Sequence, residues 1–267
     1  MKLSRIFLLL ALPYSAVAMI LMTVAYLVAY RPDVSNYFTN GSPLPIQAAV
    51  FACLAVAFGV VGAILSKRLG TPFAKPSAPS FAVLPAALGS LVTAVLLFIA
   101  KEPLPAVLFL LTAVYFALSA SSLAKRYASA ILWVGFASVA ATVVLNAAYY
   151  FDMAVEMNAP VKILLQMGLL AAMLYCCIEM RISAGLTNGS FTPILTVLAV
   201  ALCGLSSVPI AVLQFVGKLP ALAYFAASPV LFGICVTASL RLCQLIAATE
   251  PKTATTEEAT EKERTPE

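Results

Sequence analysis

Eight runs of about 20 mostly apolar residues, separated by short polar stretches, constrain this chain more than any other feature of its sequence. A helix needs about 20 apolar residues to cross the hydrocarbon core of a bilayer. Of all residues 63% are apolar and only 10% are charged, whereas soluble domains have about 25% charged residues. We therefore predict an all-α integral membrane protein with eight transmembrane helices, at 6–30, 45–66, 81–100, 105–123, 128–151, 160–180, 193–216 and 220–240.

Two details of this division have a second interpretation. Lys2 and Arg5 before the first run resemble the start of a signal peptide, but the run continues to residue 30 and is long enough for an uncleaved helix. The third and fourth runs are separated by only four residues, so one long helix is an alternative. Pro103 and Pro105 favour a tight turn there.

Lysine and arginine near the helix ends predict the orientation, because cytoplasmic loops carry the excess of basic residues. With the N-terminus inside, the cytoplasmic side receives Lys2, Arg5, Lys67, Arg68, Lys75, Lys125, Arg126, Arg181 and Arg241. The outer side receives only Arg31, Lys101, Lys162 and Lys218. Eight spans then place both termini in the cytoplasm, and we expect a bacterial cytoplasmic (plasma) membrane, with its lipid bilayer as the first partner.

The chain divides into a membrane domain at 1–248 and a tail at 249–267. The tail is rich in Thr, Glu, Lys and Pro and has no apolar stripe, so we predict a disordered cytoplasmic segment.

Pro45 and Pro105 are each followed by another proline 115 residues later. This spacing suggests two parallel four-helix halves, 1–124 and 125–248, although any eight-span protein with short loops gives similar spacing.

Several functional classes are excluded by composition. The chain has no histidine, so histidine-dependent catalysis and histidine-ligated metals are ruled out. It has no glycine-rich phosphate loop, and its basic residues are scattered, which argues against nucleic-acid binding. The six cysteines lie in or at the end of apolar runs without a Cys-x-x-Cys pair and are interpreted as packing residues. We expect no cofactor and no metal.

Polar residues inside the spans carry the most information about function, because they are expensive in a bilayer. In the fifth run Ser138, Thr142, Asn146 and Tyr149 recur at helical spacing and form one stripe. Tyr26 and Tyr149 lie near the outer boundary and are interpreted as interfacial aromatic residues. Asp152, just beyond the fifth run, is interpreted as a solvated loop charge.

Three amides fall in the outer halves of consecutive runs and predict a binding site. They are Asn146, Gln166 and Gln214, with Lys162 at the outer mouth and Ser207 beside a proline break. We predict an outward-facing cavity that binds a small polar or anionic solute. The alternative is that these groups form hydrogen bonds between helices, each contributing about 0.5–2 kcal/mol.

Glu179 is the only acidic residue inside the predicted spans. Together with Arg181 it forms a candidate ion pair or proton site near the cytoplasmic end of the sixth run. Lys125, Arg126 and Arg241 lie at a similar depth, so an ion pair that ties helix ends together is the alternative interpretation.

These features favour a small-molecule transporter, or a membrane subunit of one. The alternative is a non-catalytic membrane sensor or scaffold that binds a protein partner through its loops or tail. An intramembrane enzyme is the least supported class, because no carboxylate pair or Ser/Lys pair lies at a common depth.

Overall fold

The computed structural model describes residues 3–31, 37–39, 41–69, 73, 80–121, 128–153, 155–186, 191–219 and 222–247. Within these ranges the eight predicted apolar helices are confirmed, each long and apolar enough to span a membrane. They are α1 (Leu3–Val28), α2 (Leu44–Arg68), α3 (Leu84–Ile99) with its preceding 3-10 turn (Phe81–Val83), α4 (Pro103–Ala120), α6 (Ala128–Phe151), α7 (Pro160–Ser183), α8 (Phe191–Phe215) and the pair α9 (Leu222–Ala226) and α10 (Ser228–Ala247). A two-residue antiparallel pairing, β1 (Tyr30–Arg31) with β2 (Tyr37–Phe38), follows α1.

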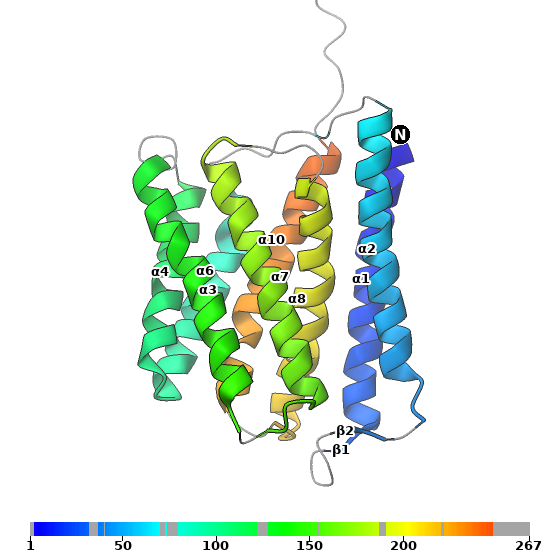
Figure 1. The fold of residues 1–267 in the computed structure, drawn as a ribbon, viewed down its shortest axis with the longest axis vertical. Coiled ribbons are helices and arrows are strands. Elements are labelled where there is room, and N and C mark those ends of the chain that lie inside the picture. The colour runs from blue at the N-terminus through cyan, green and yellow to red at the C-terminus, as the bar shows by residue number, and fades with distance from the viewer. Residues whose placement is uncertain are drawn as a thin grey trace, which may run out of the picture.

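Six of the spans form a closed ring, and the remaining two stand beside it. Around the ring, α3 packs on α4, α4 on α6, α6 on α7, α7 on α8, α8 on α10, and α10 on α3. The α1–α2 hairpin packs mainly on α8, and Figure 1 shows it on the right, in blue and cyan. The hairpin therefore lies against α8 on the outside of the ring, and α7 is the neighbour of α8 in the ring.

Small residues allow the hairpin to approach α8 closely. The buried face of α2 consists only of Ala, Gly and Ser, at Ala48, Ala52, Ala55, Gly59, Gly62, Ala63 and Ser66. A Cβ placed on Gly59 would lie 3.0 Å from the Cβ of Val197 on α8. Helix association within a bilayer depends on such close packing, because lipid tails supply no hydrophobic driving force between helices.

The helices α3 and α10 cross with their backbones in close approach. A Cβ on Gly89 would overlap the carbonyl oxygen of Pro229, and a Cβ on Gly233 would overlap that of Pro85. The last span is broken between α9 and α10. Ser228 and Val230, at the start of α10, are both buried in the bundle. Thr93 Oγ1 accepts a hydrogen bond from the Val230 N–H at 3.1 Å, which satisfies a donor at this helix start.

The connection between α3 and α4 is the tight turn that the prolines predict. Lys101 has a φ of 63°, and the N–H of Glu102 donates to the carbonyl of Leu97 at 2.9 Å. This 6→1 hydrogen bond around a left-handed residue is the arrangement that ends many helices. Pro103 then begins α4, where its missing N–H removes no helical hydrogen bond.

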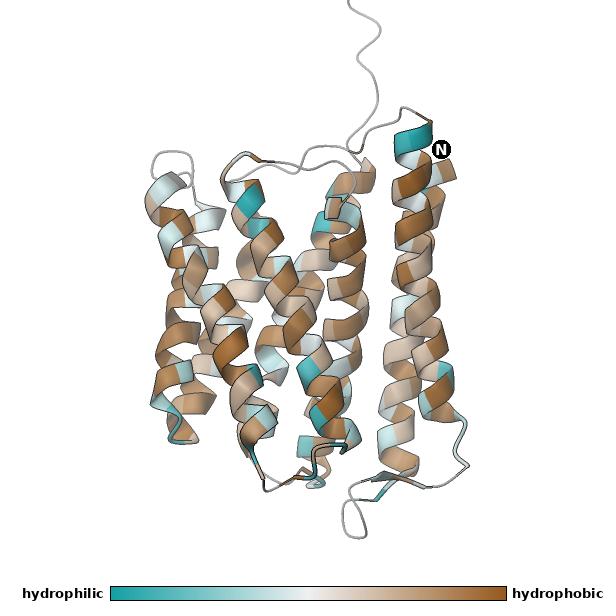
Figure 2. Ribbon diagram, in the orientation of Figure 1, coloured by the Kyte–Doolittle hydropathy of each residue, from teal (hydrophilic) through white to brown (hydrophobic). Residues whose placement is uncertain are grey.

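The hydropathy of the surface agrees with a membrane setting. Apolar residues extend along the helices, and the most polar positions gather toward their ends (Figure 2). Side chains such as Val28, Trp133 and Phe136 are exposed on the outside of the bundle. In a bilayer these side chains face lipid and need no further protein cover.

The start of α1 and the end of α10 lie at the same end of the bundle (Figure 1). We call this end the predicted cytoplasmic end and the opposite one the predicted outer end. The orientation stays a prediction, and so does the duplication into halves 1–124 and 125–248. The tail at 249–267 lies outside the described residues, as do Lys2, Lys75, Lys125 and Arg126.

Candidate functional site

The polar stripe of α6 faces inward, as its helical spacing predicts. Ser138 and Thr142 are buried, as is Tyr149, while Asn146 is half-buried. Tyr149 donates from its hydroxyl to the carbonyl of Ala223 in α9 at 2.6 Å. The Oγ of Ser138 and the Oδ1 of Asn146 are both buried atoms without a hydrogen-bond partner in the described part of the chain. The stripe thus has two unsatisfied polar atoms on one helix face.

Lys162 lies at the predicted outer end but is not open to solvent. Its side chain is 0% exposed, and its Nζ donates to the backbone carbonyl oxygens of Asp152 at 2.6 Å and Val155 at 3.3 Å. These bonds hold the connection between α6 and α7 against the start of α7. The ammonium group predicted to lie at the mouth of a cavity is therefore engaged with the backbone.

Asp152 joins this connection to the broken last span. The hydroxyl of Tyr224 in α9 donates to Asp152 Oδ2 at 2.6 Å, and the Tyr224 ring stacks on Tyr149 with centroids 5.2 Å apart. The carboxylate of Asp152 is half-buried and belongs to a network, which corrects its interpretation as a solvated loop charge. Tyr149 is likewise only 3% exposed. It is therefore a buried residue near the predicted outer end, which corrects its interpretation as an interfacial aromatic residue.

The other predicted ligand-binding residues are spread over α7 and α8. Gln166 and Gln214 are half-buried. Ser207 is fully buried; its Oγ donates to Gly204 O at 3.4 Å, and its own carbonyl accepts from Ser228 Oγ at 2.6 Å. Across the described ranges no hydrogen bond links Asn146, Gln166 and Gln214, so their convergence on one cavity stays a prediction.

Glu179 forms a two-pronged ion pair with Arg241 on α10. Arg241 Nε lies 2.9 Å from Glu179 Oε1, and Arg241 Nη2 lies 3.0 Å from Glu179 Oε2. Tyr175 also donates to Oε1 at 2.6 Å. Both charged side chains are almost fully buried. Buried charges are tolerated when they are paired and hydrogen-bonded in this way, and the pair ties α7 to α10 at the predicted cytoplasmic end.

Arg181 lies on a different side of α7 from Glu179. It is exposed and contributes to a groove of about 320 Å³ between the ends of α7 and α8, together with Phe191 and Leu195. Residues two apart on a helix point about 200° apart, so Arg181 cannot share the buried position of Glu179. The structure therefore assigns the ion pair to Arg241.

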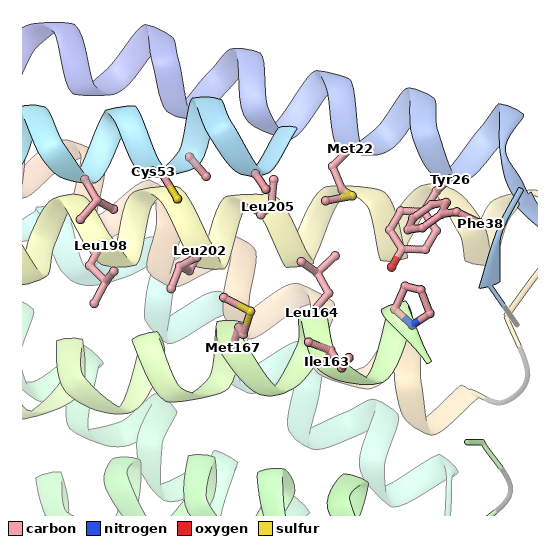
Figure 3. A pocket seen from close by; sticks show the side chains of 14 residues that line it. Met22, Tyr26, Phe38, Cys53, Ile163, Leu164, Met167, Leu198, Leu202 and Leu205 are labelled. Atoms are coloured by element: carbon pink, nitrogen blue, oxygen red, sulfur yellow. The ribbon is translucent and has the colours of Figure 1, made fainter. Parts of the chain in front are cut away.

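A larger groove follows the boundary between the α1–α2 hairpin and α7 and α8 (Figure 3). Its volume is about 580 Å³. Its walls are apolar apart from the hydroxyl of Tyr26 and are formed by Met22, Tyr26, Phe38, Ala49, Ala52, Cys53, Val56, Pro160, Ile163, Leu164, Met167, Leu198, Leu202 and Leu205.

Tyr26 supplies the polar group of this groove. The side chain is 1% exposed, and no described residue forms a hydrogen bond with its hydroxyl. Figure 3 shows the hydroxyl oxygen directed into the groove. The sequence predicts Tyr26 as an interfacial aromatic residue and does not show that it is buried. The residues that bury its ring include Tyr30 and Phe38, whose ring centroids lie 5.1 and 4.8 Å from that of Tyr26.

Comparison with known proteins supplies no further assignment. No protein-family model, curated protein or solved structure matches the chain. Within the described residues, no group of three or more His, Cys, Asp or Glu side chains is placed to hold a metal ion.

Proposed function

We propose that this protein is a membrane transporter, or the membrane subunit of one, for a small polar solute, and that the solute passes along the polar face of α6 inside the six-helix ring. The observation that carries the proposal is a pair of buried atoms on this face, Ser138 Oγ and Asn146 Oδ1, which have no hydrogen-bond partner among the described residues. A buried polar atom without a partner costs about 1–3 kcal/mol. Solute or water that enters along this face would satisfy both atoms.

Uncharged groups on this face favour a polar solute over an anionic one. The unsatisfied atoms are a hydroxyl and a carboxamide oxygen, which exchange hydrogen bonds with hydroxyl or amide groups. Two cations are buried in the described part of the ring, and both are already bound: Lys162 to carbonyl oxygens and Arg241 to the Glu179 carboxylate. Neither cation is needed for a neutral solute.

The broken last span supports transport as the activity. Discontinuous helices in transporters lie next to the substrate site near the middle of the membrane. Here α9 ends at Ala226 and α10 begins at Ser228, while Tyr149 of the α6 stripe donates to the carbonyl of Ala223. The stripe is thus bonded to α9, the short segment that precedes the break, at the predicted outer end of the ring.

Uptake into proteoliposomes tests this proposal. The purified chain is reconstituted and offered a panel of radiolabelled sugars, polyols and neutral amino acids. We expect at least one solute to enter faster than into empty liposomes, and Asn146→Leu to abolish that uptake. Phe136→Leu is the matched control, because Phe136 is exposed on α6 and lies two residues before Ser138, about 200° around the helix from the polar stripe, so its replacement should leave uptake unchanged.

The sensor or scaffold alternative makes a different forecast. It predicts no uptake of any solute in the panel and a protein partner that co-purifies in a fixed ratio with the chain. That combination of results would contradict the transporter proposal.

A further inference from the structure

We infer that the groove beside the α1–α2 hairpin holds an acyl chain of a membrane glycerolipid, whose ester carbonyl accepts a hydrogen bond from the Tyr26 hydroxyl. This site is separate from the polar face of α6. It does not depend on the proposed transport activity, because none of its lining residues lies on α6.

The chemistry of the groove matches a chain with one polar end. Its volume of about 580 Å³ falls within the range of about 300–1,000 Å³ typical of small-molecule sites. Apart from the Tyr26 hydroxyl and the thiol of Cys53, its walls offer only apolar side chains, including the ring of Pro160. Such walls bind hydrocarbon and give no partner to a solute with several polar groups.

The Tyr26 hydroxyl requires an acceptor inside the groove. Its ring is fixed between Tyr30 and Phe38, so the hydroxyl cannot turn to the surface without losing this aromatic packing. The hydroxyl is buried and lacks a partner among the described residues. Leaving it unsatisfied is costly in an apolar environment, and one carbonyl oxygen from a ligand removes that cost.

The position of Tyr26 along the membrane agrees with the position of a lipid ester. Tyr26 lies in the last turn of α1, at the predicted outer end, whereas Leu198 lies 17 residues before the end of α8. At a rise of 1.5 Å per residue, Leu198 is about 25 Å from that end. The groove therefore runs from the headgroup boundary into the hydrocarbon core, which is the course of an acyl chain below its ester.

The rim of the groove allows entry from the bilayer. Ile163 and Met167 line it from α7 and are 42% and 43% exposed, so the groove is open between them. A lipid chain can move between these side chains from the surrounding lipid. A helix of a partner protein fits less well, because its backbone carbonyls are already used in its own hydrogen bonds and supply no acceptor for Tyr26.

Photo-crosslinking tests this assignment on the full chain. The protein is reconstituted in phosphatidylcholine vesicles that contain a phosphatidylcholine with a diazirine in one acyl chain, illuminated, and digested for mass spectrometry. We expect crosslinks concentrated on groove residues such as Met167 and Leu202. Tyr26→Phe removes only the hydroxyl and should lower groove crosslinking about five- to tenfold, the effect of one lost hydrogen bond.

Two further variants make the result decisive. Leu202→Trp fills the groove and should remove the crosslinks, and Tyr150→Phe, at an exposed position on α6 away from the groove, should leave them unchanged. The thermal midpoint of each variant is measured to confirm folding. Crosslinks spread evenly over exposed positions such as Phe136, or unchanged in both Tyr26→Phe and Leu202→Trp, would overturn the assignment. Displacement of the probe by a quinone but not by unlabelled phosphatidylcholine would also overturn it.

Discussion

Removing Arg241 should destabilise the protein far more than removing Arg181, although the two arginines lie at the same predicted end of the membrane. Arg241→Met leaves the Glu179 carboxylate buried at 1% exposure, with only the Tyr175 hydroxyl still bonded to it among the contacts described above. Breaking a buried ion pair by removal of one partner costs about 3–5 kcal/mol. For a chain of this size that corresponds to a fall of about 10 °C in the thermal midpoint.

Arg181→Met is the matched control for this experiment. Arg181 is exposed, and surface substitutions usually change stability by less than about 0.5 kcal/mol. The double variant Glu179→Leu/Arg241→Met removes both charges together, so it should be more stable than Arg241→Met alone.

Thermal unfolding in a mild detergent, followed by circular dichroism, measures all four variants (the two arginine changes, Glu179→Leu and the double change). A double-mutant cycle from these midpoints should give a coupling of about 2–3 kcal/mol between Glu179 and Arg241. Equal losses from Arg181→Met and Arg241→Met, or additive effects of Glu179→Leu and Arg241→Met, would refute the argument that the pair ties α7 to α10.

Three other predictions test the packing, the topology and the tail. Gly89→Ala should lower the free energy of unfolding by about 1–3 kcal/mol, because the new Cβ would overlap the backbone of α10. Gly204→Ala should lower it less, because its Cβ would face the thiol of Cys235, and equal losses would contradict the close crossing. Cysteines that replace Met153 and Leu186 in a cysteine-free chain should react with an impermeant maleimide from opposite sides of the membrane; reaction from the same side would contradict the eight-span topology. Deletion of 253–267 should leave the thermal midpoint unchanged, and a large fall would show that the tail packs on the membrane domain.

The number of spans could be predicted from the sequence because the length of an apolar run is set by the thickness of the bilayer. The turn between α3 and α4 could also be predicted, since Pro103 and Pro105 prevent one continuous helix. The division of the last span was missed. Its signal is Pro229, because a proline has no N–H to donate to the preceding turn and fits only in the first turn of a helix, and α10 begins at Ser228.

The long-range contacts could not be predicted in the same way. Glu179 and Arg241 are 62 residues apart, and only the packing of α7 beside α10 selects Arg241 among the basic residues at that end. Tyr26 and Asp152 were interpreted as boundary residues because each stands where an apolar run meets polar sequence. Their burial depends on Phe38 and Tyr224, which come from other segments.

Access of water to the polar face of α6 is the most direct test of the proposed route. Asn146 is replaced by cysteine in a chain whose six native cysteines are changed to alanine, and a small impermeant thiol reagent is added from the outer side. Met153→Cys, exposed in the connection after α6, and Phe136→Cys, exposed in the middle of α6 and about 200° around the helix from Ser138, are the fast and slow references. The route predicts that Asn146→Cys reacts at least about tenfold faster than Phe136→Cys, because water that enters along this face reaches the carboxamide oxygen, which has no hydrogen-bond partner among the described residues. A rate as slow as that of Phe136→Cys would show that this face is closed to water and would contradict the proposal.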